Sequence, residues 1–245
     1  MNNAKVAAEK YGVNLSRLPV HIGIIMDGNG RWATAKNLPR LVGHREGYKT
    51  LRSVVLFANE LGIKFLTVYA FSVENWKRPQ DEVDGLMDLI TQAAIDELRI
   101  MHQNNVRVKV IGRMNDLPDK LQNALNNGIE TTKNNNGITF TLAINYGGRA
   151  EIVDAVKQIL KASPPPDIIS EETINENLYN PELPEPDLLI RTAGEMRLSN
   201  FLLWQSAYSE LVVLPVNWPD FSLNDLLEAC KQYGERTRKF GAVIP

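Results

Sequence analysis

The sequence predicts a single α/β domain with a mostly parallel central β-sheet flanked by helices. Short apolar runs alternate along the chain with longer segments whose apolar residues recur at helical spacing. Helices of this length between strands are typical of βαβ units, and their crossovers make neighbouring strands parallel. A chain of 245 residues, 44% of them hydrophobic, is long enough to form one such domain with a sizeable core.

Apolar runs of strand length occur at six places in the chain. The first is rich in isoleucine and is followed at once by Asp27-Gly28-Asn29-Gly30. The predicted strands, in chain order, are 20–26, 64–71, 106–111, 138–144, 188–190 and 211–214.

Helical periodicity occurs in the segments between these strands. In the first segment the apolar residues continue to Ala58, and the pattern ends before Gly62, a common residue at the end of a helix. The longest segment has its apolar residues along one side, which fits either core packing or the wall of a tunnel. The predicted helices are 43–61, 80–103, 116–133, 149–160 and 223–239.

Two proline-rich stretches, 164–166 and 181–186, are predicted to be surface connections rather than linkers between domains. The alternation of strands and helices continues across both of them. We therefore expect one domain over residues 21–245, preceded by a short N-terminal segment over residues 1–20.

The composition excludes several classes of protein. A net charge of −2 gives no indication of a nucleic-acid partner. The single cysteine, Cys230, excludes an internal disulfide and a cysteine-rich metal site, and it suits a reducing cytoplasm. No run approaches the ~18 apolar residues that would span a bilayer, and the N-terminus lacks the apolar core of a signal peptide. We expect a cytoplasmic protein that contacts a membrane only peripherally if it handles a lipid.

Polar clusters follow four of the predicted strands, at residues 27–30, 72–78, 145–149 and 191–199. In open parallel sheets, ligands bind at the carboxyl ends of the strands. We therefore expect these four clusters to assemble one site.

The cluster after the first strand indicates an anion and a cation together. Gly28 and Gly30 let backbone N–H groups approach an anion closely, and with Ala33 they match a degenerate dinucleotide-binding fingerprint. That interpretation fails because Asp27 would repel a bare pyrophosphate, and because the acidic residue expected ~20 positions later is missing. A divalent cation between Asp27 and a phosphate would resolve the conflict. The alternative is a simple turn in which Asp27 caps a helix.

The cluster at 191–199 resembles a diphosphate receptor in its chemistry. Arg191, Arg197 and Ser199 flank a small turn, and two arginines can neutralise most of the charge of a diphosphate. The alternative is two surface arginines paired with acids. In the loop at 72–79, Trp76 offers an apolar face and Arg78 a phosphate fork, although an exposed polar loop would look similar.

Two further positions are less informative alone. Arg40 and His44 could face a phosphate, but a single histidine more often makes a structural hydrogen bond. Glu210 precedes an apolar run, where it could act as a cap or as a second ligand of a hard cation.

Five ordered blocks of this sequence resemble the cis-prenyltransferases, from about His21 to the C-terminus, and within them the bacterial undecaprenyl diphosphate synthases. The blocks begin with the residues around Asp27 and His44 and end near Trp218. They comprise residues 21–33 with 43–47, 69–79, 145–149 with 187–191, 197–205 with 208–210, and 218–221. Departures are small: Ala193 stands where the family often has serine or glycine, and Met196 where it often has a polar residue.

The resemblance implies a role for each matching residue. Asp27 would hold Mg²⁺ and assist the departure of diphosphate, Asn75 would accept a proton, and Glu210 would be the second carboxylate at the ion. The allylic diphosphate pocket would contain Gly28, Asn29, Gly30, Arg31, Trp32, Arg40 and His44. The loop that closes on the substrates would contribute Ser72, Val73, Glu74, Trp76 and Arg78. The isopentenyl diphosphate site would contain Arg191, Arg197, Leu198 and Ser199.

The implied activity is Mg²⁺-dependent, repeated condensation of isopentenyl diphosphate onto an allylic diphosphate, by default farnesyl diphosphate. The product would be a long Z-polyprenyl diphosphate, by default undecaprenyl diphosphate, the precursor of the lipid carrier for cell-wall peptidoglycan. Residues 21–245 would be the catalytic domain of a homodimer with a hydrophobic tunnel, and the tail at 236–241 resembles the bacterial ending. Helix 80–103 and the strand containing Phe140 are the candidate tunnel walls.

Three other functions compete with this one. A non-catalytic partner subunit that binds prenyl diphosphate should lack Asp27 or the Arg197–Ser199 pair, and this chain has them. A phosphate-ester hydrolase with Asp27 as nucleophile would not need a second diphosphate site. A dinucleotide-dependent oxidoreductase lacks its acidic partner. The sequence does not define the length of the product, for which Ala70, Leu86, Ile90 and Phe140 are the candidate determinants.

Overall fold

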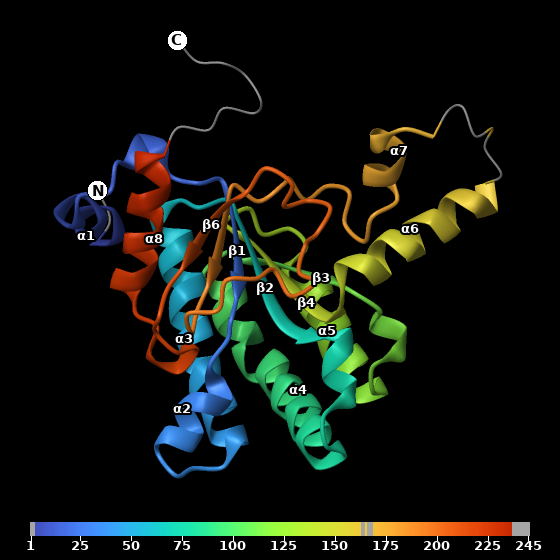
Figure 1. Ribbon diagram of the computed structural model, residues 1–245, viewed down its shortest axis with the longest axis horizontal. Coiled ribbons are helices and arrows are strands. Elements are labelled where there is room, and N and C mark those ends of the chain that lie inside the picture. Colours follow the sequence, from blue (N-terminus) through green and yellow to red (C-terminus); the bar gives the residue numbers. More distant parts are fainter. Residues whose placement is uncertain (1–2, 163–164, 166–168, 237–245) are drawn as a thin grey trace.

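The computed structural model describes residues 3–162, 165 and 169–236. These residues form an α/β domain around a six-stranded sheet with the order β3-β4-β2-β1-β5-β6 (Figure 1). All five strand pairings are parallel. The predicted fold class is confirmed, and the sheet is parallel throughout rather than mostly so.

The six strands agree with the predicted ones to within two residues at each end. They are β1 (His21–Ile25), β2 (Phe65–Ser72), β3 (Arg107–Ile111), β4 (Thr139–Tyr146), β5 (Leu188–Arg191) and β6 (Glu210–Val213). The central strand β1 is buried along its whole length, because the sheet is covered on both faces.

The long helices also follow the prediction. They are α3 (Arg40–Leu61), α4 (Gln80–Gln103), α5 (Asp119–Thr132), α6 (Gly148–Ala162) and α8 (Leu223–Glu235). Prolines explain the shifted starts, since Pro39 and Pro118 stand at the N-caps of α3 and α5. The prediction for α8 was too long, because Arg236 is already extended. Residues 237–241 of the predicted tail, and residues 164 and 166 of the first proline stretch, lie outside the described residues.

Three short helices were not predicted: α1 (Asn3–Tyr11), α2 (Asn29–Ala35) and α7 (Glu171–Glu176). The N-terminal helix α1 buries Ala4 and Ala8 in the same core cluster as β1, α3 and α8. The described part of the expected N-terminal segment, residues 1–20, thus packs onto the domain.

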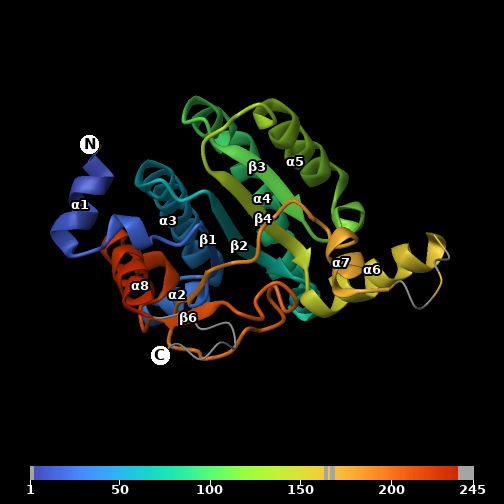
Figure 2. The same ribbon diagram turned by 90° about the horizontal axis from the view of Figure 1, so that it is seen from above.

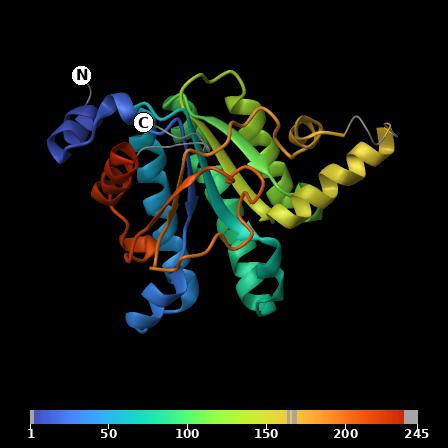
Figure 3. The ribbon, with the colours of Figure 1, turned by 45° about the horizontal axis from the view of Figure 1, so that its top comes forward.

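The helices form layers on the sheet. Helices α3, α4 and α5 lie next to one another (Figure 3). Their apolar side chains pack against the strands. Helix α6 and the short α7 project away from the rest of the domain (Figures 1 and 2). In the described part of the chain, no helix combines the length and the hydropathy required to cross a bilayer.

Candidate active site

Residues from two strand-end loops meet at the carboxyl end of the sheet. Asp27 follows β1, Arg191 ends β5, and Ser199 lies in the loop after β5. The Arg191 guanidinium donates from Nη2 to Asp27 Oδ2 at 2.9 Å and from Nη1 to Ser199 Oγ at 2.7 Å. Arg191 is only 3% exposed, so the surrounding structure fixes this bridge. The polar loops that follow β1 and β5 therefore form one site.

The Asp27 carboxylate is held in its ionised form. Its Oδ1 accepts a 2.7 Å hydrogen bond from the backbone N–H of Gly28, and Arg31 Nη2 lies 3.4 Å from Oδ2. Burial acts to raise the pKa of Asp27, but the hydrogen bonds from Arg191 and Gly28 and the charges of Arg191 and Arg31 lower the pKa below its usual value. Asp27 thus presents a negatively charged oxygen at the edge of the sheet.

A second group of cations lies where α3, α4 and the loop after β2 come together. Arg78 Nη1 lies 2.9 Å from Glu82 Oε1, and Arg40 Nε lies 3.2 Å from Glu82 Oε2. A Cβ atom at Gly30 would lie 2.7 Å from the Arg40 guanidinium, so the absence of a side chain at Gly30 leaves room for the guanidinium. Glu82 therefore holds two of the predicted phosphate-binding arginines side by side.

His44 lies one turn after Arg40 on α3 and lines the cavity described below. Its Nε2 is buried and has no hydrogen-bond partner in the described residues. Burial, followed by the positive charge of Arg78, lowers the pKa of His44 to about 4. The imidazole is therefore neutral near pH 7, and its buried Nε2 remains available to accept or donate a proton.

We expect the NMR resonances of His44 to titrate with a midpoint near 4. Because the folded pKa lies below the unfolded value of about 6.5, the unfolded chain binds more protons between these values. Stability is therefore lost as the pH falls from 6.5 toward 4. The chain has only three histidines, so His44→Gln and His102→Gln spectra assign the signals. A His44 midpoint at 6 or above would show that the imidazole is not desolvated.

The loop after β2 forms a short 3-10 helix, η2 (Val73–Lys77). The side-chain oxygen of Asn75 accepts a 3.1 Å hydrogen bond from the backbone N–H of Ser72 and so caps the turn. Trp76 donates from Nε1 to Asn145 Oδ1 at 2.7 Å and packs edge-on against Phe71. Glu74 accepts a 2.7 Å hydrogen bond from Asn200 Nδ2, which ties this loop to the one that contains Ser199.

The loop after β5 carries the remaining predicted arginine. Arg197 is exposed and pairs with Glu195, which also lies 3.2 Å from Arg31 Nη1. The backbone oxygen of Arg197 accepts from Arg191, so the buried arginine fixes the course of this loop. Met196 is exposed, and its apolar side chain displaces no charged group from the site.

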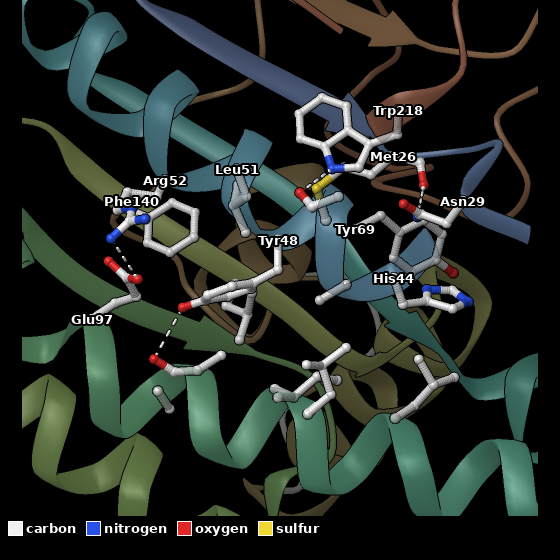
Figure 4. Close-up of a pocket in the computed structure, with 18 of the residues that line it drawn as sticks. Met26, Asn29, His44, Tyr48, Leu51, Arg52, Tyr69, Glu97, Phe140 and Trp218 are labelled. Atoms are coloured by element: carbon white, nitrogen blue, oxygen red, sulfur yellow. Dashed lines mark hydrogen bonds and ion pairs between the residues drawn. The ribbon is translucent and has the colours of Figure 1, made fainter. Parts of the chain in front are cut away.

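An apolar cavity of about 350 Å³ opens beside these charged groups. Its walls come from α3, α4, α5 and the strands β2 to β4 (Figure 4). The predicted site residues that line it are Asp27, Asn29, His44, Ser72, Asn75, Arg78, Arg191 and Ser199. The candidate length determinants Ala70, Leu86, Ile90 and Phe140 line it as well. The predicted tunnel and its two walls are therefore confirmed.

The other predicted site residues are not part of the cavity wall in the described structure. They are Gly28, Gly30, Arg31, Trp32, Arg40, Val73, Glu74, Trp76, Arg197, Leu198 and Glu210. Trp32 is engaged elsewhere, since its Nε1 donates to Asp220 Oδ1 at 2.7 Å and its ring lies under Lys36.

Glu210 lies at the opposite end of the sheet from Asp27. Glu210 is the first residue of β6 and is in register with Leu188, the first residue of β5. Asp27 lies just beyond Ile25, which is in register with Arg191 at the end of β5. At about 3.3 Å per residue, roughly 16 Å of strand separates the two carboxylates. Glu210 instead accepts a 2.7 Å hydrogen bond from Arg236. Within one chain, Asp27 and Glu210 therefore cannot bind the same ion, and this corrects the expectation that they would.

Four residues without an individual sequence-based role organise the site: Glu82 and Asn200, which lie outside the four predicted polar clusters, and Asn145 and Glu195, which lie inside two of them. Two of them could have been found. Glu82 follows Arg78 by four residues at the start of a helix, and Glu195 stands two residues before Arg197. The bond between Trp76 and Asn145 joins two of the predicted clusters, as expected, whereas no local pattern indicates the bond from Asn200 to Glu74.

This arrangement defines a class of protein that binds a ligand with an anionic head and a hydrocarbon tail. Charged side chains lie together at the carboxyl ends of the parallel strands, and an apolar cavity extends away from them.

Comparison with known proteins agrees with that class. The family described as "Putative undecaprenyl diphosphate synthase" matches residues 25–241. An isoprenyl transferase from Fusobacterium nucleatum is 53% identical over 226 residues, which are 92% of this chain and 97% of the relative.

Two solved structures have the same fold. Lavandulyl diphosphate synthase from Lavandula x intermedia, in complex with dimethylallyl diphosphate, superposes with a TM-score of 0.89 at 36% identity, covering 92% of this chain and 99% of that one. A probable undecaprenyl diphosphate synthase from Campylobacter jejuni gives 0.78 at 32% identity, covering 91% and 98%. The chain belongs to the cis-prenyltransferases, the undecaprenyl diphosphate synthase-like family of isoprenyl transferases.

Proposed function

We propose that this protein condenses isopentenyl diphosphate repeatedly onto an allylic diphosphate, with farnesyl diphosphate as primer and Mg²⁺ as cofactor. The observation that carries the proposal is the direct opening of the apolar cavity at the cluster of Asp27, His44, Arg78 and Arg191. One ligand can thus place its diphosphate among the charges and its chain inside the cavity. The related lavandulyl diphosphate synthase, described in complex with dimethylallyl diphosphate, supports an allylic diphosphate as substrate.

Two groups of arginines provide for two diphosphates. Arg31, Arg40 and Arg78, with His44 and the Gly28–Gly30 turn, form the proposed allylic site. Arg191 and Arg197, with Leu198 and Ser199, form the proposed isopentenyl diphosphate site. Asp27 lies between them, since its carboxylate contacts both Arg31 and Arg191.

Asp27 fits a Mg²⁺ ion by its chemistry, because an ionised carboxylate is a ligand that this cation prefers. The described residues contain no group of three acidic, histidine or cysteine side chains that could hold a metal alone. Diphosphate oxygens and water would therefore complete the coordination. A contribution from Glu210 would require a second copy of the chain. When bound, the ion would neutralise charge on the departing diphosphate.

The residues of the chain perform the other steps. Arg31, Arg40 and Arg78 stabilise the negative charge that develops on the leaving diphosphate as the allylic C–O bond breaks. Arg191, Arg197 and Ser199 orient isopentenyl diphosphate so that its double bond attacks the allylic carbon. A proton then leaves to give the Z double bond. Asn75 is a weak base, and its amide oxygen is already bonded to Ser72, so a diphosphate oxygen shares this role.

Growth of the chain is favoured by the cavity. Burying each CH₂ group contributes about 0.8 kcal/mol, so the apolar walls draw the growing end inward. The proposed product is a long Z-polyprenyl diphosphate of about undecaprenyl length, the precursor of a lipid carrier for peptidoglycan. Such a product favours a cytoplasmic enzyme that touches the membrane peripherally when it releases its product.

A single assay tests the activity. Purified protein is incubated with farnesyl diphosphate, labelled isopentenyl diphosphate and Mg²⁺, and the labelled products are separated by chain length. We expect long polyprenyl products and release of pyrophosphate. Binding of farnesyl diphosphate without incorporation would indicate a non-catalytic partner subunit. Release of inorganic phosphate without chain growth would indicate a hydrolase.

We further propose that the protein is a homodimer. Helix α6 projects from the domain, and Val153, Val156 and Leu160 are exposed on it at helical spacing. An apolar face of this kind favours burial against another subunit. Light scattering should give a mass about twice that of the chain, and a monomeric mass at micromolar concentration would contradict the proposal.

A further inference from the structure

A pair of charged side chains lines the otherwise apolar part of the cavity. Arg52 on α3 and Glu97 on α4 lie across from each other, with Nη1 3.2 Å from Oε1. Figure 4 shows this pair beside Phe140, with Tyr48 and Leu51 between the pair and the end that contains His44 and Asn29. The pair therefore lines the part of the cavity that is distal to the proposed diphosphate sites, one turn of α4 before the last lining residue of that helix, Met101.

The two charges are unequally exposed. The side chain of Arg52 is 40% exposed, whereas that of Glu97 is only 12% exposed. The pair thus stands at the boundary between the cavity and solvent, with the carboxylate on the inner side.

The carboxylate of Glu97 lowers the stability of the fold at this position. Its Oε2 is buried and has no hydrogen-bond partner in the described residues. Burial raises the pKa of Glu97 despite the opposing charge of Arg52, and the charge of Asp96 acts in the same direction as burial. A buried oxygen that lacks a partner destabilises the fold, so stability does not explain the carboxylate.

We propose that Arg52 and Glu97 form a polar gate that limits how far a hydrocarbon chain can extend into the cavity, and so limits the length of the product. This inference rests on the proposed function. While the chain end contacts Leu86, Leu89 or Ile90, each added isoprene unit gains apolar contact. When the chain end reaches the gate, the next unit must lie against the charged pair and displace water from its exposed part, chiefly Arg52. Elongation then becomes unfavourable, and the product is released.

The polar gate differs from a purely steric end wall in its response to substitution. Leucine is close to glutamate in size but has no charge to dehydrate. With Glu97→Leu, a polar gate would open while a steric wall would remain. With Glu97→Ala, either kind of barrier would open.

The experiment compares the product lengths of Glu97→Leu, Glu97→Gln and Glu97→Ala with that of the wild type, using farnesyl diphosphate and labelled isopentenyl diphosphate. Asp88→Leu, an exposed carboxylate on the same helix, is the matched control. We expect Glu97→Leu to lengthen the main product by at least one isoprene unit and to increase the fraction of longer products at least threefold. Glu97→Gln should give a smaller increase, and Asp88→Leu none.

Two results would overturn the polar gate: unchanged product length in Glu97→Leu, or longer products in Glu97→Ala alone. Circular dichroism and the rate of the first condensation establish that each variant is folded and active. Failure of the proposed function is distinguishable, because the wild type and Asp88→Leu would then form no polyprenyl product at all. Failure of the gate alone leaves products of wild-type length.

Discussion

Asp27→Ala should lower turnover by about 10²–10³-fold, the loss typical of removing one group that stabilises transition-state charge. Binding of farnesyl diphosphate should change much less, because the arginines and His44 that we propose as the receptor of its diphosphate remain in place. Removal of the carboxylate also frees Arg191 from its 2.9 Å partner, which offsets part of any loss in diphosphate binding. Single-turnover kinetics measure the chemical step, and calorimetry measures the binding.

The controls separate charge from shape. Asp27→Asn keeps the size of the side chain but loses its charge, so it should be nearly as inactive as Asp27→Ala. Asp88→Asn removes an exposed carboxylate from α4 and should leave turnover unchanged. If Asp27→Ala kept a turnover near that of the wild type, Asp27 would not be the metal-side residue of the reaction.

Arg191→Lys should lower kcat/KM for isopentenyl diphosphate by about a hundredfold or more, because a buried charged donor with several partners is lost. A lysine is a point charge and cannot reproduce the fork that reaches Asp27, Ser199 and the backbone of Arg197 together. The loop after β5 would lose its anchor, and the pKa of Asp27 would rise because its main hydrogen bond is gone.

The matched control is Arg197→Lys, which removes the guanidinium of an exposed arginine in the same loop. Since Arg197 pairs only at the surface with Glu195, its replacement should cost much less than that of Arg191. Initial rates over a range of isopentenyl diphosphate concentrations measure both effects. Equal losses in the two variants would show that the burial of Arg191 has no special role.

The alternation of strands and helices could be predicted because each element has its own hydrophobic period. Helix α4 was predicted at both ends, since Pro79 precedes it and its apolar side faces the core and the cavity. The start of α5 was misplaced at Asp116, although Pro118, which stands at the N-cap and delays the helix to Asp119, is a start signal in the sequence. The short α2 has too few residues to show a period.

Glu210 shows where the sequence is ambiguous. A carboxylate beside an apolar run marks one end of a strand but does not say which end. In a parallel sheet all strands start on one side and finish on the opposite side. Glu210 is the first residue of its strand and Asp27 follows the end of its own, so they lie at opposite ends of the parallel strands. The contact between Asp27 and Arg191 joins residues far apart in the chain and depends on β1 and β5 being neighbours, which local patterns do not define.

The structure also shows how the site compensates its own charge. Each of the five arginines predicted to hold substrate already has a carboxylate neighbour: Arg31 and Arg191 at Asp27, Arg40 and Arg78 at Glu82, and Arg197 at Glu195. Under the proposed function, substrate binding is therefore an exchange of counter-ions rather than the filling of a bare positive pocket. A singly charged anion gains little from such an exchange, whereas a diphosphate with several negative charges can replace more than one carboxylate at once. The arrangement favours diphosphates over the simpler anions of the cell, and it keeps the arginines in place before any substrate arrives.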